Sequence, residues 1–322
     1  MKLNFVMNGN LNVIDLFCGA GGLSFGFQEA GYNILTAIDN DPYAIETYSN
    51  NIKTHFKPIT KSIRKIKASD LLDYIKMAQG ELDLLIGGPP CRGFSMANRQ
   101  NNNKNNPYNQ LIHYYVHFIE HIAPKAFLFE NVKGLKIFDK GTIHEYFLKK
   151  IKKNKYIVNQ FLFSCEDLGM PQKRERLIIV GTKKRKKLNI DLKKEKKINV
   201  QEAIDDLPNL ENGNRRDPLP YKKFENISQY QKEMRENCNS DIVYNNLVTK
   251  NSDLVIERYN HIKQGGNWSD IPEKLMKNYS NIKNCHSSIY HRLSNKKPSI
   301  TMCNFRKNMI VHPDQNRGLS VR

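Results

Sequence analysis

The chain has 322 residues, of which 39% are hydrophobic and 26% charged, as in a soluble globular protein with one large domain or a large and a small one. No apolar run approaches the roughly 20 residues that span a bilayer. Asn8 and Asn10 interrupt the start, where a signal peptide needs an apolar core, so we expect a cytoplasmic protein that does not bind membranes. The formal net charge of +19 favours a polyanionic partner, but a Lys-rich composition that only confers solubility explains it equally well.

Short apolar runs alternate with amphipathic stretches in the first part of the chain. We expect strands at 13–17, 34–38, 82–86, 126–129 and 177–180, with helices such as 43–50 and 111–121 between them. Strands and helices alternating at this spacing predict an α/β fold with a doubly wound, mostly parallel sheet. In such sheets ligands bind at the carboxyl ends of the strands. Residues that directly follow strands are therefore the first candidates for a site.

A glycine-rich turn follows the first expected strand. Residues 18–22 read CGAGG, and glycines there let the backbone approach a ligand closely. The next strand ends in Asp39, 20 residues after Gly19, where a carboxylate can accept hydrogen bonds from ribose hydroxyls. A tight packing turn without a ligand is the simpler alternative. The turn lacks the full Gly-x-Gly-x-x-Gly pattern and provides nothing for a pyrophosphate, which favours S-adenosylmethionine over NAD.

The third expected strand leads into a rigid loop that carries a cysteine. The sequence GGPPCRGFS occupies 87–95, and its two prolines fix an extended approach to Cys91. Arg92 beside the thiol would stabilise a thiolate. Most lone cysteines are inert, so this one depends on its context for any special role.

The cysteines as a set predict no disulfide framework and no metal site. They are scattered without a Cys-x-x-Cys pair, at positions 18, 91, 165, 238, 285 and 303. Cys285 and His286 with His291 give a weak hint of a metal site, and ordinary surface or core positions explain them better. We expect no bound metal.

Charged side chains mark the last two expected strands. Glu130 follows 126–129, and a carboxylate at a strand end can act as an acid. Arg174 and Arg176 come just before 177–180 at alternate positions, so both side chains are expected on one face. A structural ion pair at the strand ends is the plainer explanation for these residues.

The composition changes after residue 182. Lys-rich runs at 183–187 and 193–197 are more typical of a solvated surface than of a specific contact. Residues 200–208 predict a short helix that ends at Pro208. From about 209 to 290 the chain is polar and weakly periodic, which indicates a smaller, irregular second region.

Several of the segments described above together resemble the ordered signature motifs of DNA cytosine-5 methyltransferases. The matching segments are 15–27, 87–95, 130–132 and Gln172-x-Arg174-x-Arg176, in the family's order and spacing, and 297–301 with 312–313 resembles its penultimate block. The resemblance implies a Rossmann-like fold, S-adenosylmethionine as methyl donor, double-stranded DNA as partner and an enzyme of the bacterial restriction–modification type. It further implies a catalytic and cofactor-binding domain at 1–184, a target-recognition region at 185–290 and a return segment to the catalytic domain at 291–322.

The resemblance assigns the chemistry to four side chains. Cys91 would add to carbon 6 of cytosine and make carbon 5 nucleophilic. Glu130 would hold a proton near ring nitrogen 3 and the amino group. Arg176 would approach the base's carbonyl oxygen, and Arg174 would position the catalytic loop or a phosphate. The target carbon is inaccessible inside a duplex, so the base would be flipped into the pocket.

The resemblance also assigns the cofactor pocket. The residues expected to bind S-adenosylmethionine are Phe17, Gly19, Ala20, Gly22, Asp39, Asn40, Ser62, Ile63, Pro90 and Leu111. Phe17 would lie against the adenine, the glycine turn near the methionine part, and Asp39 at the ribose. The chain departs from the family at Ser62, where an Asp usually accepts from the adenine amino group. A hydroxyl can still accept, but with less charge assistance, so we expect cofactor binding to survive in a weakened form.

In the family, the region equivalent to 185–290 reads the DNA sequence. Here it contains side chains at 258–259, 265–268 and 290–292 that could reach base edges or phosphates. Gly265 and Gly266 with Trp268 equally form a packed turn, which is the safer interpretation of Trp268.

Family members usually continue beyond the position of Arg322 into a further helix and a final Gly-Asn block. The resemblance thus implies a fragment, a truncated product or one subunit of a split enzyme that a C-terminal chain complements, and otherwise a monomer. A catalytically impaired DNA-binding fragment is the alternative from another class. An RNA cytosine-5 methyltransferase is a third alternative, which no feature of the sequence favours.

Overall fold

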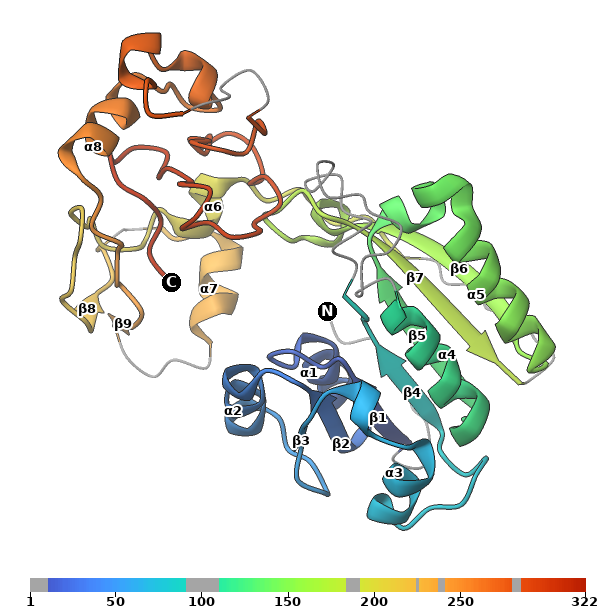
Figure 1. Cartoon of the computed structure of the whole chain (residues 1–322). Coiled ribbons are helices and arrows are strands. Elements are labelled where there is room, and N and C mark those ends of the chain that lie inside the picture. The colour runs from blue at the N-terminus through green and yellow to red at the C-terminus, as the bar shows by residue number, and fades with distance from the viewer. Residues whose placement is uncertain (1–10, 91–109, 184–191, 224–225, 237–240, 280–284) are drawn as a thin grey trace. The chain divides into compact units, whose positions relative to one another are not determined.

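The computed structural model describes residues 11–90, 110–183, 192–223, 226–236, 241–279 and 285–322. The chain forms two compact units (Figure 1). The first comprises 1–163 and 175–190, and the second comprises 164–174 and 191–322. Segments 164–174 and 291–322 thus both belong to the second unit. The division by function expected at residues 184 and 290 stays a prediction.

The first unit is built on a seven-stranded sheet of order β3-β2-β1-β4-β5-β7-β6. Its strands are β1 (Asn12–Leu16), β2 (Asn33–Asp39), β3 (Ile59–Thr60), β4 (Leu84–Gly87), β5 (Ala126–Asn131), β6 (Ile157–Ser164) and β7 (Glu175–Thr182). Neighbouring strands from β3 to β5 pair in parallel, and β7 pairs antiparallel with β5. The predicted α/β fold with a mostly parallel sheet is confirmed.

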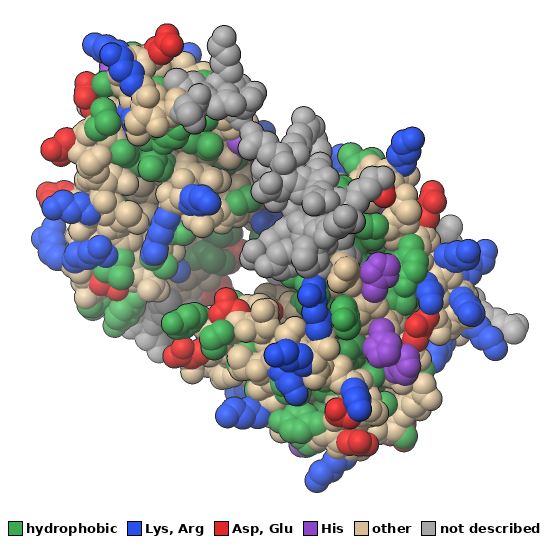
Figure 2. All heavy atoms as spheres, in the orientation of Figure 1, with side chains coloured by type: hydrophobic (Ala, Val, Ile, Leu, Met, Phe, Trp, Pro, Cys, Tyr) green, Lys and Arg blue, Asp and Glu red, His purple; other side chains and the backbone are tan. Residues whose placement is uncertain are grey.

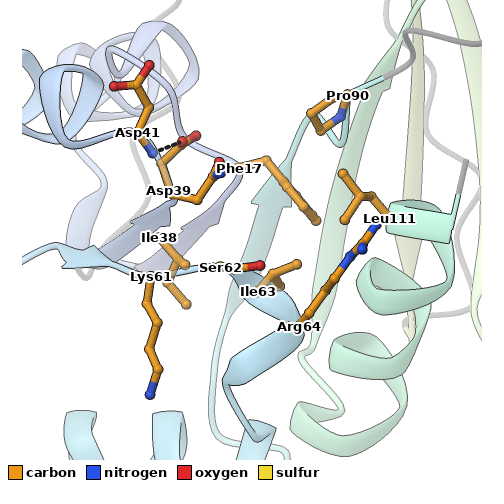
Figure 3. Close-up of a pocket in the computed structure, with 11 residues that line it drawn as sticks. Phe17, Ile38, Asp39, Asp41, Lys61, Ser62, Ile63, Arg64, Pro90 and Leu111 are labelled. Atoms are coloured by element: carbon orange, nitrogen blue, oxygen red, sulfur yellow. Dashed lines mark hydrogen bonds between the residues drawn. The ribbon is translucent and has the colours of Figure 1, made fainter. Parts of the chain in front are cut away.

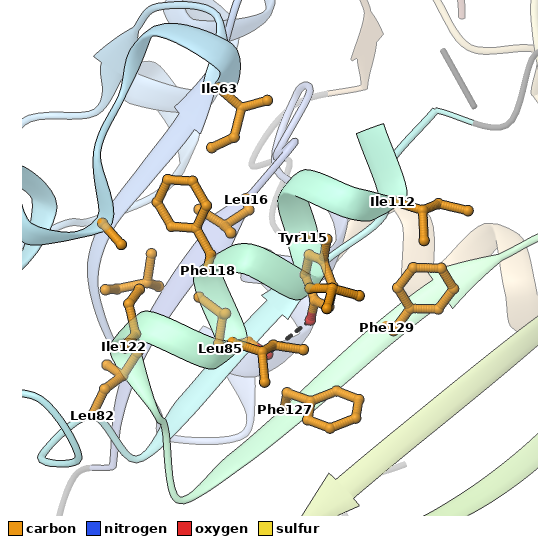
Figure 4. Packing of buried hydrophobic residues seen from close by; sticks show 14 of the residues in the cluster. Leu16, Ile63, Leu82, Leu85, Ile112, Tyr115, Phe118, Ile122, Phe127 and Phe129 are labelled. Atoms are coloured by element: carbon orange, nitrogen blue, oxygen red, sulfur yellow. Dashed lines mark hydrogen bonds between the residues drawn. The ribbon is translucent and has the colours of Figure 1, made fainter. Parts of the chain in front are cut away.

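Helices cover both faces of this sheet because its strands alternate their apolar side chains between the two faces. On β4, Leu85 packs in one core cluster while Leu84 and Ile86 pack in another. The first cluster includes residues of α3 (Ala68–Ile75), α4 (Leu111–Ile122) and α5 (Thr142–Lys153) (Figures 1 and 4). The second includes residues of α1 (Gly22–Glu29) and α2 (Pro42–Asn51).

Two strands escaped the sequence-based prediction. β3 has only two residues, which is too short to show any periodicity. β6 lies at the edge of the sheet, and Asn159 and Gln160 interrupt its apolar residues. The first strand also ends one residue earlier than expected, at Leu16, so Phe17 belongs to the turn that follows.

The second unit contains less regular secondary structure than the first, as expected. Its elements are α6 (Val200–Ile204), β8 (Leu219–Pro220), α7 (Gln229–Arg235), β9 (Ile242–Val243) and α8 (Asp253–Asn260), with short 3-10 turns at Cys165–Leu168, Trp268–Asp270 and Glu273–Leu275. The predicted helix at 200–208 is shorter than expected and ends at Ile204. Its start is fixed by a capping box, in which Asn199 and Glu202 each satisfy a backbone N–H of the other.

Two arginines expected to reach DNA are buried inside the second unit, so that expectation is wrong for both. The Arg258 side chain is 2% exposed and donates to the Leu275 carbonyl oxygen at 2.9 Å. Arg292 is 6% exposed and donates to the carbonyl oxygens of Tyr259 and Ile262, each at 2.7 Å. These bonds occupy guanidinium donors that would otherwise contact phosphates or bases. Both arginines therefore hold the unit together. Trp268 packs against the adjoining core cluster, as the safer interpretation expected.

The Lys-rich run at 193–197 forms local ion pairs. Lys197 lies 2.9 Å from a carboxylate oxygen of Glu166, and Lys196 lies 2.6 Å from one of Glu202. Lys194 pairs with Asp167 at 3.6 Å. On the face shown in Figure 2, Lys and Arg side chains are scattered among acidic ones. Exposed pairs of this kind contribute little to stability, but they partly compensate the charge of this run.

No helix within the described ranges combines the length and the apolar character needed to cross a membrane.

Candidate active site

A cavity of about 560 Å³ opens at the carboxyl ends of the parallel strands in the first unit (Figure 3). It is lined by Phe17, Ile38, Asp39, Asn40, Asp41, Lys61, Ser62, Ile63, Arg64, Pro90 and Leu111. These residues come from the last two positions of β2, from the segments that follow β1 to β4 and from the start of α4. The sheet topology thus gathers side chains that lie far apart in the sequence, as expected for a doubly wound fold.

Most of the residues predicted to bind the cofactor meet in this cavity. They are Phe17, Asp39, Asn40, Ser62, Ile63, Pro90 and Leu111. Gly19, Ala20 and Gly22 are not among the lining residues; Gly19 and Ala20 lie on the adjoining turn after β1, and Gly22 begins α1. The sequence-based prediction missed Ile38, Asp41, Lys61 and Arg64, although each is within one residue of a predicted one.

Phe17 holds an unusual backbone conformation at the edge of the cavity. Its φ is +61°, in the left-handed region that a bulky residue rarely adopts. Its ring extends toward Ile63 and Arg64 (Figure 3). Such strain persists only where the surroundings enforce it, and it is concentrated at functional sites. The turn therefore presents an aromatic face to the cavity at a conformational cost.

Asp39 is oriented by the glycine turn. One of its carboxylate oxygens accepts from the Gly19 N–H at 2.9 Å, and the other accepts from the Asp41 N–H at 3.0 Å. Each carboxylate oxygen can accept more than one hydrogen bond, so both retain capacity for a ligand's hydroxyls. Asp41 itself caps α2, where it accepts from the Tyr43 N–H at 2.9 Å.

The glycine turn packs tightly against the helix behind it. Gly21 has a φ of +97°, and a Cβ there would lie 2.9 Å from side-chain atoms of Tyr48 and Ile52. Any other residue at this position would displace these two side chains. At Gly19 and Gly22, by contrast, a Cβ would meet no atom within 4 Å. The backbone at these two glycines is therefore open to a ligand, beside the N-terminus of α1.

A buried carboxyl lies beneath this turn. Asp15 is fully buried and accepts from the Ser24 hydroxyl at 2.7 Å, and Ser24 in turn accepts from the Tyr48 hydroxyl at 2.7 Å. Its second oxygen has no hydrogen-bond partner among the described residues. Burial, together with the nearby charge of Asp39, raises the pKa of the Asp15 carboxyl from 3.8 to about 7. Burial likewise raises the pKa of the neighbouring Cys18 thiol, which keeps this cysteine unreactive.

We expect Asp15 to make the first unit less stable as the pH rises. The folded state holds the Asp15 proton between pH 4 and about 7 while the unfolded state has lost it, so the free energy of unfolding falls through this window. The full effect is on the order of 4 kcal/mol at 1.36 kcal/mol per pKa unit. Urea unfolding at pH 5 and pH 8 should show a smaller loss of stability for Asp15→Asn than for the native chain. Parallel losses in the two proteins would contradict this, and the exposed Asp73→Asn is the matched control.

The loop that leads to Cys91 is fixed against β5. The Asn131 side chain is buried and donates to the Pro89 carbonyl oxygen at 3.3 Å. A Cβ at Gly88 would lie 2.8 Å from a carboxylate oxygen of Glu130, so a larger residue there would push the end of the Glu130 side chain aside. Cys91 itself lies outside the described residues. Asn131 is a positioning residue that the prediction did not single out, although it follows Glu130 directly.

Glu130 and Arg176 meet across the antiparallel pair β5 and β7. The Arg176 Nε lies 2.5 Å from a Glu130 carboxylate oxygen, and Arg176 also donates to the Glu175 carbonyl oxygen at 2.8 Å. Both side chains are partly exposed, at 27% for Glu130 and 18% for Arg176. Arg174 belongs to the second unit, where its carbonyl oxygen accepts from the Cys165 N–H at 2.8 Å. The pair can present a carboxyl and a guanidinium to one ligand.

Comparison with known proteins finds similarity along nearly the whole chain. A sequence model of the C-5 cytosine-specific DNA methylase family matches residues 11–322. The type II methyltransferase M.DdeI of Desulfomicrobium norvegicum is 30% identical over 328 residues, which cover 97% of this chain and 76% of that protein. M1.HphI of Haemophilus parahaemolyticus is 28% identical, with 97% and 76% covered.

Among solved structures, a DNA modification methyltransferase encoded within an E. coli prophage has the same fold. It superposes with a TM-score of 0.73 at 24% sequence identity, covering 97% of this chain and 86% of that one. Because the match to the family includes both units and not the glycine turn alone, the chain belongs to the C-5 cytosine-specific DNA methylase family and is a DNA (cytosine-5-)-methyltransferase.

Proposed function

We propose that the chain transfers a methyl group from S-adenosylmethionine to carbon 5 of cytosine within a specific sequence of double-stranded DNA. The observation that carries this proposal is the placement of two sites on one sheet. The cavity beyond β1 to β4 adjoins Pro90, the residue before Cys91, and the same loop packs against Glu130. A methyl donor in the cavity would thus lie beside the nucleophile and the base-binding carboxyl.

The residues of the cavity fit S-adenosylmethionine. Phe17, Ile63 and Leu111 offer an aromatic face and apolar walls for a flat base, and Asp39 offers carboxylate oxygens for ribose hydroxyls. The open backbone at Gly19 and at the start of α1 suits the carboxylate of the methionine part. When bound, the cofactor supplies an electrophilic methyl group.

The catalytic residues would act on a cytosine that has left the helix. The Cys91 thiolate adds to carbon 6, and the electron pair of the 5,6 double bond is directed to carbon 5, which takes the methyl group. The proton on carbon 5 is then lost to solvent, the electron pair of that C–H bond re-forms the 5,6 double bond, and the Cys91 thiolate leaves carbon 6 with the electrons of its bond, which restores the ring. Glu130 holds a proton at ring nitrogen 3 and accepts from the amino group, while Arg176 donates to the carbonyl oxygen of the base.

The Glu130–Arg176 ion pair supports these roles. The ion pair fixes the guanidinium beside the carboxyl, so that a cytosine edge with acceptor and donor groups meets complementary partners on both. Arg174 would position a phosphate or the loop that carries Cys91. Extrusion of the base is required because carbon 5 cannot be reached inside a duplex.

The similar type II methyltransferases support a role in restriction–modification, with the reaction in the cytoplasm where the DNA lies. We assign the recognition of the DNA sequence to the second unit. Because Arg258 and Arg292 are buried there, the base-reading side chains must be others.

The experiment is to incubate the purified chain with isotope-labelled S-adenosylmethionine and mixed-sequence DNA, and to analyse the nucleosides by mass spectrometry. We expect label in 5-methyldeoxycytidine, and bisulfite sequencing of the same DNA should place it in one recurring sequence. DNA binding without labelled 5-methyldeoxycytidine would contradict the proposal and favour a binding protein. Label in tRNA but not in DNA would favour an RNA enzyme.

A further inference from the structure

The two ends of the cavity differ in the chemistry of their side chains. Asp39 and Asp41 lie together at one end (Figure 3). At the other end the Phe17 ring, Leu111 and the Arg64 side chain lie close together. The acidic end suits hydroxyls and the aromatic end suits a flat base. The base of a bound nucleoside is therefore placed beside Arg64.

The groups that meet the edge of this base are a hydroxyl and a guanidinium. Ser62 is half-buried, and its hydroxyl points to the side of the cavity where Ile63 and Arg64 lie (Figure 3). Ser62 caps no backbone N–H of the 3-10 turn it begins, Ile63–Lys65, so its hydroxyl remains available to a ligand. The acidic residues among the described lining are Asp39 and Asp41, which belong to the other end.

This pair of groups does not distinguish a 6-amino from a 6-oxo purine. Adenine presents an amino donor at position 6 and an acceptor at nitrogen 1, whereas hypoxanthine presents an acceptor and a donor. A hydroxyl can donate or accept, so Ser62 suits either edge. A guanidinium only donates, so Arg64 can donate to nitrogen 1 of adenine and, because a carbonyl oxygen accepts two hydrogen bonds, can share the 6-oxygen of hypoxanthine with the Ser62 hydroxyl. A carboxylate in place of Ser62 would accept from the amino group and repel the 6-oxygen.

We propose that Ser62 and Arg64 set the base specificity of the cofactor pocket, and that the pocket binds 6-oxopurine nucleosides as well as adenosine. The inference rests on the proposed function, because it concerns how the methyl donor's nucleoside is read. Ser62 allows a 6-oxygen to bind because its hydroxyl can donate a hydrogen bond to that atom. Arg64 can donate a hydrogen bond to either base.

Calorimetric binding of S-adenosylhomocysteine and its deaminated analogue, S-inosylhomocysteine, tests this directly. For the native chain we expect dissociation constants within about tenfold of each other, which is about 1.4 kcal/mol. Ser62→Asp should bind the adenosyl compound as well or better and disfavour the inosyl compound about 100-fold more than the native chain does, because a carboxylate faces the 6-oxygen. Retained binding of the adenosyl compound also shows that this variant is folded.

Arg64→Met and Lys65→Met form a matched pair. Loss of the guanidinium donor should weaken both compounds about tenfold. Lys65 is an exposed cation on the same 3-10 turn and is not among the residues that line the cavity, so its replacement should change both affinities less than about twofold.

The outcomes separate the inference from the proposed function. Tight binding of the adenosyl compound with at least about 100-fold weaker binding of the inosyl compound to the native chain would overturn the inference alone. An unchanged ratio in Ser62→Asp would also overturn it. No binding of S-adenosylhomocysteine at all would overturn the proposed cofactor, and the inference with it.

Discussion

Replacement of Cys91 with alanine is expected to abolish methyl transfer, with a loss in rate of at least ~10³-fold. Without the thiolate, carbon 5 of cytosine stays a poor nucleophile, and no other side chain of the proposed site can add to carbon 6. The described residues that line the cofactor cavity are unchanged in this variant, so we expect S-adenosylhomocysteine to bind it with an affinity close to the native one. Transfer of labelled methyl to DNA and calorimetric binding of S-adenosylhomocysteine measure the two effects separately.

Cys303→Ala is the matched control, because Cys303 is an exposed free cysteine of the second unit. It should retain the native rate. Cys18 is no substitute nucleophile, because its thiol is buried and its pKa is raised. A rate for Cys91→Ala within about tenfold of the native rate would exclude the covalent mechanism.

The second large effect is expected at Glu130. Glu130→Gln keeps the shape of the side chain but removes its ability to hold and release a proton, and it also removes the charge that pairs with Arg176 at 2.5 Å. We expect the rate of methyl transfer to fall by about 10²–10⁴-fold, the usual contribution of a positioned acid or base. Single-turnover methyl transfer with saturating DNA measures this loss independently of binding.

Glu175→Gln provides the comparison. Glu175 lies on β7 beside Arg176, but its exposed carboxylate pairs with Lys133 at 3.3 Å. If acidic residues on this edge of the sheet acted only through their charge, Glu130→Gln and Glu175→Gln would lower the rate of methyl transfer equally. We expect Glu175→Gln to keep its rate within about twofold, and an equal loss in both variants would contradict a specific role for Glu130.

The sheet was predictable because its signal is local. The alternation of apolar strands with amphipathic helices, as at residues 82–86 and 111–121, is readable in short windows. The predicted ends of the strands then identified Asp39 and Glu130 as candidate site residues. β3 was not predictable from such a signal, because its two residues pair only in the context of β2.

Burial of charged residues was not predictable, because their partners are distant in sequence and neutral. Arg292 bonds with carbonyl oxygens near residues 259–262, and no pattern in the chain marks those as its partners. Asp15 likewise reads as one polar residue in an apolar strand, and only the packing of Ser24 and Tyr48 shows that its carboxyl is enclosed. The conformation of Phe17 and the contact from Asn131 to Pro89 depend on tertiary packing in the same way.

The most direct test of the mechanism is covalent trapping on DNA whose cytosines are replaced by 5-fluorocytosine. After methyl transfer carbon 5 carries fluorine in place of the proton that must leave, so the bond between sulfur and carbon 6 cannot break. We predict a complex that survives denaturation, forms only with S-adenosylmethionine present, and yields a nucleotide-modified peptide containing Cys91 on digestion and mass spectrometry. An adduct on another cysteine, or 5-methylcytosine formed in ordinary DNA by a chain that yields no such adduct, would contradict the assignment of Cys91 as the nucleophile.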